Sequence, residues 1–217
     1  MKPAALIFDL DGTLVDSVPD LAAAANRLLA ELDRPPVATA EVAAMVGDGV
    51  AKLVERVLAA RGVPTPPAPL VPRFVQLYDA DIATRTRPYP GVVDGLAALA
   101  GRGIALAICT NKIGQSTHAV LAALDLQRYF RVVVSGDTLP QQKPDPAPLR
   151  FALDRLGVAA AAAAMLGDHR NDVLAARAAG TAALFAGYGY GRASLGALEP
   201  DATIDHFAEL PGVVEAM

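Results

Sequence analysis

Acidic residues whose spacing suits catalysis or metal binding occur at two places in this 217-residue chain. Asp9 and Asp11 follow one apolar run, and Asp168 and Asp172 follow another. If the chain stays extended beyond the first run, alternate residues share one side, so Asp9, Asp11 and Thr13 point the same way. Four carboxylates gathered in a partly dry cleft would repel one another, so a compensating positive charge is expected beside them.

We expect that charge to come from a hard divalent cation and from Lys143. Oxygen ligands with room left for water and phosphate are what Mg²⁺ prefers, so the sequence predicts a Mg²⁺ site. Thr110, the backbone of Asn111 and Lys143 offer donors that suit the oxygens of a phosphoryl group. The polar residues therefore predict chemistry on a phosphorylated ligand.

Short apolar runs alternate with helix-like spacing, and together they predict the elements that carry these residues. The runs lack strict alternation, which is typical of strands buried on both faces. They cover residues 4–8, 104–109, 132–134, 163–166 and 182–185, and helical spacing covers residues 92–99, 117–126, 149–156 and 173–179. This order predicts an α/β fold, a Rossmann-like parallel sheet core with helices on both faces. Ligands of such sheets bind beyond the carboxyl ends of the strands, where the polar residues lie.

Residues 17–87 show helical spacing without a convincing strand. Their apolar positions predict helices near residues 21–32, 42–46, 50–58 and 74–78. We therefore expect an inserted all-helical cap domain at residues 17–87, and an α/β core domain made of residues 1–16 and 88–217.

Composition and charge argue against several classes of protein. Hydrophobic residues make up 53% and charged residues 19%, which favours a packed core over disorder. The net charge of −4 argues against a nucleic-acid surface built on bulk positive charge. The single cysteine, Cys109, cannot form a disulfide within the chain, and no apolar stretch suits a signal peptide or a membrane span. We expect a cytoplasmic protein, a monomer or homodimer, with no nucleic-acid or membrane partner.

Four segments, taken in order, resemble the motifs of the haloacid dehalogenase superfamily. They are residues 9–17 (Asp-Leu-Asp-Gly-Thr-Leu-Val-Asp-Ser), Thr110-Asn111, Lys143-Pro144, and Gly167-Asp168 with Asp172. The resemblance covers essentially the whole chain, with the helical insertion after the first motif. It implies a Mg²⁺-dependent phosphomonoester hydrolase that acts on a small phosphorylated metabolite.

The resemblance also implies a role for each matching residue. Asp9 would attack phosphorus and form an aspartyl-phosphate, while Asp11 would protonate the leaving alkoxide and then deprotonate the attacking water. Mg²⁺ would be held by Asp9, the backbone carbonyl of Asp11 and Asp168. Lys143 would bridge Asp9 and a phosphoryl oxygen, and Asp172 would orient Lys143 or a metal-bound water. The implied substrate contacts are Thr13, Thr110 and Asn111.

A closer resemblance is to phosphoglycolate phosphatases. It rests on Val46-Gly47-Asp48-Gly49, Tyr89-Pro90-Gly91, Gly167-Asp168 with Arg170-Asn171-Asp172, and Gly187-Tyr188-Gly189-Tyr190-Gly191. It implies hydrolysis of 2-phosphoglycolate to glycolate and phosphate. In the expected cap, the loop at Gly47 suits a segment that dips into the cleft, and Lys52 could meet a substrate carboxylate.

Other functions stay open at this point. The main alternative is a sugar-phosphate or amino-sugar-phosphate phosphatase of the same superfamily, because such enzymes share several of these features. A β-phosphoglucomutase-like mutase is less favoured, since those relatives typically carry an arginine where this chain has Val50. A phosphorylatable signalling domain would lack the large helical cap, and a noncatalytic binding protein is disfavoured because every expected catalytic position is filled. One residue departs from the superfamily pattern: His169 stands where serine or threonine is common, and we expect its ring to point into solvent.

Overall fold

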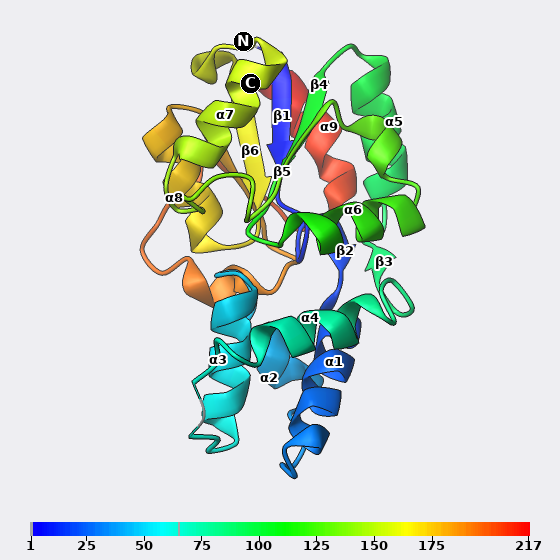
Figure 1. Cartoon of the computed structure of the whole chain (residues 1–217). Helices are drawn as coiled ribbons and strands as arrows, with labels where there is room; N and C mark the ends of the chain where they lie inside the picture. The colour runs from blue at the N-terminus through cyan, green and yellow to red at the C-terminus, as the bar shows by residue number, and fades with distance from the viewer. Residues whose placement is uncertain (1, 65) are drawn as a thin grey trace.

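The computed structural model describes residues 2–64 and 66–217, and its centre is a six-stranded parallel sheet (Figure 1). Met1 and Thr65, which fall in the expected core and cap domains, lie outside the described residues. The strand order is β5-β4-β1-β6-β7-β8. The strands are β1 (Ala5–Phe8), β4 (Ala105–Cys109), β5 (Val132–Val134), β6 (Ala163–Gly167), β7 (Ala182–Ala186) and β8 (Ala202–Ile204). The predicted α/β fold is confirmed, and β8 is a strand that the sequence did not indicate.

The central strands are buried because both faces of the sheet are covered by helices. Alternate residues of β1 enter different clusters: Leu6 and Phe8 pack on one face, and Ala5 and Ile7 on the other. The first face packs against α5 (Val92–Gly101), α6 (Gly114–Ala123) and α9 (Leu210–Ala216), and the second against α7 (Ala147–Leu156) and α8 (Arg170–Ala179). Burial on both sides explains why these strands are apolar without alternation.

Four helices of the insertion form a hydrophobic core of their own. They are α1 (Val18–Glu31), α2 (Thr39–Ala43), α3 (Val50–Ala60) and α4 (Val71–Asp79). The second helix begins and ends earlier than its apolar spacing predicted. Ala38 N donates to the Glu41 carboxylate at its start, and residues 44–49 are not helical. The division into a cap domain at residues 17–87 and a core domain at residues 1–16 and 88–217 stays a prediction.

A two-stranded antiparallel ribbon lies between the insertion and the sheet (Figure 1). It pairs β2 (Val15–Asp16) with β3 (Arg87–Pro88), so the chain enters the helical insertion and returns from it at the same place. Short 3₁₀ helices occupy Gln127–Tyr129, Ala160–Ala162, Gly191–Ser194 and Phe207–Glu209. Across residues 2–64 and 66–217, no helix combines the length and apolar character that crossing a membrane requires.

Candidate active site

Three buried aspartates meet where β1 and β6 end, and we call Asp9, Asp168 and Asp172 the acidic cluster. Parallel pairing places Phe8 of β1 opposite Leu166 of β6, so the residues that follow emerge at the same sheet edge. Asp172 joins them from the first turn of α8. One carboxylate oxygen from each aspartate lies within 4.8 Å of the other two. The structure therefore brings together acidic residues more than 150 positions apart in the chain.

Lys143 faces this cluster with its ammonium group almost fully buried. Its Nζ lies 3.1 Å from Asp9 Oδ1 and 2.6 Å from Asp172 Oδ1. The side chain of Asn111 fixes the lysine backbone: Asn111 Nδ2 donates to the Lys143 carbonyl at 2.9 Å, and Lys143 N donates to Asn111 Oδ1 at 3.0 Å. Asn111 thus positions Lys143 with its side chain, a contact that the sequence did not predict.

The electrostatics of the cluster leave negative charge uncompensated. Burial raises the pKa of Asp9 to about 6 against the opposing effect of Lys143. Burial, reinforced by the charge of Asp9, also raises the pKa of Asp168 well above its usual range. Burial alone would lower the pKa of Lys143, but Asp172 and Asp9 raise it above its usual value, so this lysine stays charged. One buried ammonium opposite three carboxylates fits a site for a divalent cation, because all the donors are hard oxygens.

The Asp168 carboxylate accepts hydrogen bonds from backbone N–H groups, and it lies so close to neighbouring glycines that a side chain at those positions would collide with it. Its Oδ2 accepts hydrogen bonds from Tyr190 N at 2.8 Å and Gly191 N at 3.1 Å. A Cβ at Gly12, where φ is +81°, would lie 2.3 Å from the same oxygen. Thr13, predicted to contact substrate, is fully buried, and its Oγ1 donates to Asp168 Oδ1 at 3.2 Å. The glycine-rich segment at 187–191 therefore fixes the carboxylate, a role that was not predicted for it.

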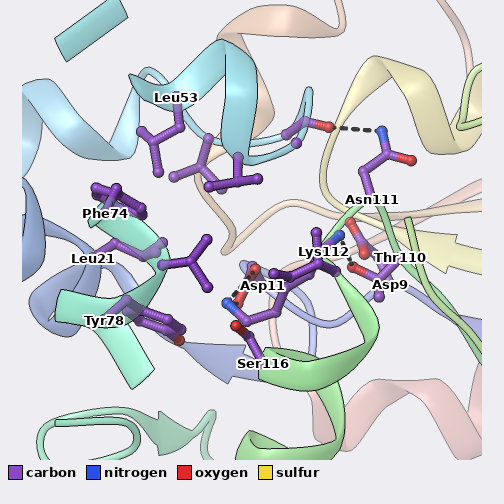
Figure 2. Close-up of a pocket in the computed structure, with 16 residues that line it drawn as sticks. Asp9, Asp11, Leu21, Leu53, Phe74, Tyr78, Thr110, Asn111, Lys112 and Ser116 are labelled. Atoms are coloured by element: carbon purple, nitrogen blue, oxygen red, sulfur yellow. Dashed lines mark hydrogen bonds and ion pairs between the residues drawn. The ribbon is translucent and has the colours of Figure 1, made fainter. Parts of the chain in front are cut away.

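A pocket lies beside the acidic cluster, between the sheet edge and the insertion (Figure 2). Four residues predicted for the site line its sheet side: Asp9, Asp11, Thr110 and Asn111. We call the opposite side the apolar wall, and it consists of Leu21, Val46, Val50, Leu53, Phe74 and Val75. Gly47, predicted to lie at the substrate, also lines this pocket. Residues predicted to be catalytic and an apolar surface thus line one cavity.

Lys52, predicted to meet a substrate carboxylate, is not among the residues that line this pocket. Its side chain is 56% exposed, and its Nζ forms an ion pair with Glu55 at 2.8 Å. A different basic residue, Lys112, lines the pocket instead, with its Nζ 3.1 Å from Asp11 Oδ2. Sequence reasoning stopped at Thr110-Asn111 and missed this lysine, although a basic residue directly after those two was a usable signal.

The loop at Gly47 joins the insertion to the core through specific contacts. The Gly47 carbonyl accepts a hydrogen bond from Asn111 Nδ2 at 3.1 Å, and Asn171 Nδ2 donates to Asp48 Oδ1 at 2.7 Å. A Cβ at Gly47, where φ is +123°, would lie 2.7 Å from His169 Cδ2. The expectation that His169 points into solvent is wrong, because the imidazole is half-buried against this loop. The absence of a side chain at Gly47 is what allows the close approach.

Sequence comparisons find a matching family and relatives over most of the chain. The family model described as haloacid dehalogenase-like hydrolase matches residues 6–186. A phosphoglycolate phosphatase from Rhodospirillum rubrum is 47% identical, over 96% of this chain and 89% of the relative.

Two solved structures share the fold. A protein from Haemophilus somnus, described as a predicted phosphoglycolate phosphatase, has a TM-score of 0.92 and 29% identity, covering 98% of each chain. A CbbY variant from Rhodobacter sphaeroides, solved in complex with xylulose-(1,5)-bisphosphate, has a TM-score of 0.80 and 27% identity, covering 96% of each chain. The chain belongs to the haloacid dehalogenase-like hydrolase family.

Proposed function

We propose that this protein is a phosphoglycolate phosphatase that hydrolyses 2-phosphoglycolate to glycolate and phosphate with the help of Mg²⁺. The observation that carries the proposal is the 47% identity to a phosphoglycolate phosphatase across 96% of the chain. The site supports the reaction class, because the acidic cluster and Lys143 offer a nucleophile, cation ligands and a counter-charge in one buried place.

In the proposed reaction, Asp9 is the nucleophile and Asp11 is the general acid and base. A carboxylate oxygen of Asp9 attacks phosphorus, the ester P–O bond breaks, and Asp11 donates a proton to the departing glycolate oxygen. Asp11 then removes a proton from the water that attacks the aspartyl-phosphate, which releases phosphate and restores Asp9. Both residues line the same pocket, so one substrate can reach both carboxylates.

The remaining predicted residues neutralise negative charge or bind the phosphoryl group during these steps. Lys143, 3.1 Å from Asp9, neutralises charge on the attacking carboxylate and on a phosphoryl oxygen, and Asp172 orients it at 2.6 Å. Thr110 and the backbone of Asn111 bind the phosphoryl group.

The cation completes the proposed site. Mg²⁺ would be held by Asp9, Asp168 and the backbone carbonyl of Asp11, and when bound it offsets negative charge as the phosphoryl dianion meets a carboxylate. Thr13 contributes by holding Asp168 at 3.2 Å.

The insertion is proposed to act as a cap that covers the bound phosphoryl group and excludes water. Gly47 belongs to the loop that contacts the core through Asn111. Lys52 as a ligand of the substrate carboxylate, a cytoplasmic location, and a monomeric or homodimeric state all stay predictions.

A sugar-phosphate phosphatase is the second candidate, because the CbbY structure that shares this fold was solved with a sugar bisphosphate. The test is phosphate release from 2-phosphoglycolate, glucose 6-phosphate and glucosamine 6-phosphate, with Mg²⁺ and with EDTA. We expect kcat/KM for 2-phosphoglycolate to exceed the other two by at least about 10²-fold. A sugar phosphate that matches or exceeds 2-phosphoglycolate would favour the second candidate.

A further inference from the structure

We propose that Lys112 binds the carboxylate of the leaving group and so makes the site selective for short phosphomonoesters that carry an acid beside the ester oxygen. This inference rests on the proposed function and deepens it, because it assigns the substrate carboxylate to one residue.

Lys112 is placed inside the pocket and held there by two neighbours. Its side chain is 7% exposed, and its Nζ lies 3.1 and 3.3 Å from the two carboxylate oxygens of Asp11. The same Nζ lies 4.4 Å from the centre of the Tyr78 ring. Figure 2 shows the Lys112 and Asp11 side chains pointing toward each other at the edge of the pocket. A buried ammonium with these partners has a defined position before any substrate arrives.

Lys112 is the one basic side chain among the described residues that line this pocket. A carboxylate placed against the apolar wall would lose its hydration and needs a positive partner. Lys52 is exposed and paired with Glu55, and the guanidinium of Arg56 donates to the Met45 carbonyl and to Asp48. Lys112 is therefore the cation that a substrate carboxylate meets in this cavity.

The chemistry of the substrate puts its carboxylate at this lysine. In 2-phosphoglycolate the carboxyl carbon is attached to the carbon that bears the ester oxygen. Asp11 is proposed to act on that oxygen, and Lys112 contacts Asp11 directly. An ammonium group has three donors, so Lys112 can keep a bond to Asp11 while it donates to the substrate.

Tyr78 supplies an independent observation in the same cavity. It lines the pocket and is 3% exposed, and among the described residues no partner lies within normal hydrogen-bond distance of its buried Oη, although Lys112 is close enough to interact with it. An unpaired buried hydroxyl is costly, and a polar ligand atom would satisfy it. Lys112 Nζ and Tyr78 Oη thus offer two donors to one carboxylate. The apolar wall offers no partner for the hydroxyl groups of a sugar, which disfavours longer polyol phosphates.

The test uses two non-hydrolysable phosphonates as inhibitors of p-nitrophenyl phosphate hydrolysis by the full chain with Mg²⁺. 3-Phosphonopropionate is the isostere of 2-phosphoglycolate with carbon in place of the ester oxygen, and propylphosphonate has a methyl group in place of the carboxylate. For the wild type we expect 3-phosphonopropionate to bind at least about tenfold more tightly, which is what one hydrogen-bonded charge contributes. Lys112→Met should bring the two inhibition constants within about twofold of each other.

Matched variants separate this role from a general loss of structure. Lys112→Arg keeps the charge and should retain most of the preference, and Lys2→Met, at an exposed lysine, should leave it unchanged. If Lys112→Met fails to fold in a thermal melt, Tyr78→Phe serves instead and should weaken only 3-phosphonopropionate, by about threefold or more.

Three outcomes in the variants would overturn the inference. The first is an unchanged ratio of the two inhibition constants in a folded Lys112→Met or, in its place, in Tyr78→Phe. The second is equal weakening of the binding of both phosphonates. The third is a selective loss of 3-phosphonopropionate binding in Lys52→Met instead. Failure of the proposed function looks different, because the wild type would then hydrolyse p-nitrophenyl phosphate but not 2-phosphoglycolate. A wild type that hydrolyses 2-phosphoglycolate but shows no preference for the carboxylate analogue would overturn this inference alone.

Discussion

The acidic cluster and the apolar wall meet at one pocket, which Asp9 lines on the side of the cluster, but burial affects the two regions in opposite ways. The cluster gathers buried like charges, and burial raises the pKa values of Asp9 and Asp168. The wall gathers apolar side chains, and all of them except Val75 belong to or pack against the hydrophobic core of the insertion. Burial of apolar surface stabilises the fold, whereas burial of uncompensated charge opposes it. Replacing an aspartate of the cluster by a neutral residue should therefore remove activity at little cost in stability, and changes at the wall should alter substrate binding.

The largest expected effect comes from Asp9→Asn, which removes the proposed nucleophile. Turnover of 2-phosphoglycolate should fall by at least about 10³-fold. Because the change also removes one of the buried like charges, the melting temperature of the metal-free protein should stay the same or rise. Phosphate release and a thermal melt measure the two effects. Asp94→Asn, at an exposed position on α5, is the control and should match the wild type. Retained Mg²⁺-dependent activity in Asp9→Asn would remove its assigned role.

Removal of the divalent cation should abolish turnover and change stability in a pH-dependent way. The pKa of Asp9 is about 6 in the folded metal-free protein, above its ordinary value of 3.8. A raised carboxyl pKa means that the folded form binds the proton more tightly, so stability falls as pH rises from about 4 to about 6 and stays low above that. A bound cation relieves this charge. Mg²⁺ should therefore raise the melting temperature more at about pH 7.5 than at about pH 5.

The measurement is a thermal melt with Mg²⁺ or EDTA at the two pH values, together with phosphate release. Restoration of activity by Mg²⁺ after EDTA treatment is the expected control. An equal Mg²⁺ effect on melting at both pH values would contradict the electrostatic account of the cluster.

Lys143→Met should destabilise the protein, because it removes the buried ammonium that faces the acidic cluster. Loss of one partner of a buried ion pair costs about 3–5 kcal/mol, so the free energy of unfolding should fall by about that amount in metal-free protein. Adding Asp172→Asn should restore part of the loss, since the two side chains are 2.6 Å apart and their effects are coupled. Urea denaturation measures both, with Lys2→Met as the control. Equal destabilisation in the single and double variants would show that the ion pair does not matter.

The smallest effect is expected from Gly47→Ala, which pushes the insertion loop away from the cluster. The added Cβ would lie 2.7 Å from the imidazole of His169, and φ of +123° disfavours any side chain. KM for 2-phosphoglycolate should rise about tenfold, equivalent to about 1.4 kcal/mol. Gly101→Ala has open space around it and should leave KM unchanged. An unchanged KM in Gly47→Ala would show that this loop does not help to close the site.

The pattern of apolar runs was enough to predict where the strands end, but it was not enough to predict the contacts between residues at the ends of different strands. Asp9 and Asp168 were predictable because each follows an apolar run that could only be a buried strand. Lys112 was missed because its pairing with Asp11 joins residues 101 positions apart and depends on how β1 and β4 align. Lys52 was predicted for the substrate carboxylate, but Glu55 lies three residues further along the same helix and pairs with it in solvent. The short strand β8 was not predicted because the exposed Thr203 lies at its centre, whereas β5, which is equally short, is an unbroken run of valines.

The most direct test of the central claim is a crystal structure of the protein grown with Mg²⁺ and beryllium fluoride, an analogue of a phosphoryl group. We expect the beryllium fluoride to be bonded to a carboxylate oxygen of Asp9, with the Mg²⁺ ion against Asp9 and Asp168 and with Lys143 facing the fluoride. Beryllium fluoride bound elsewhere, or a cluster whose aspartates separate and bind no ion, would contradict it.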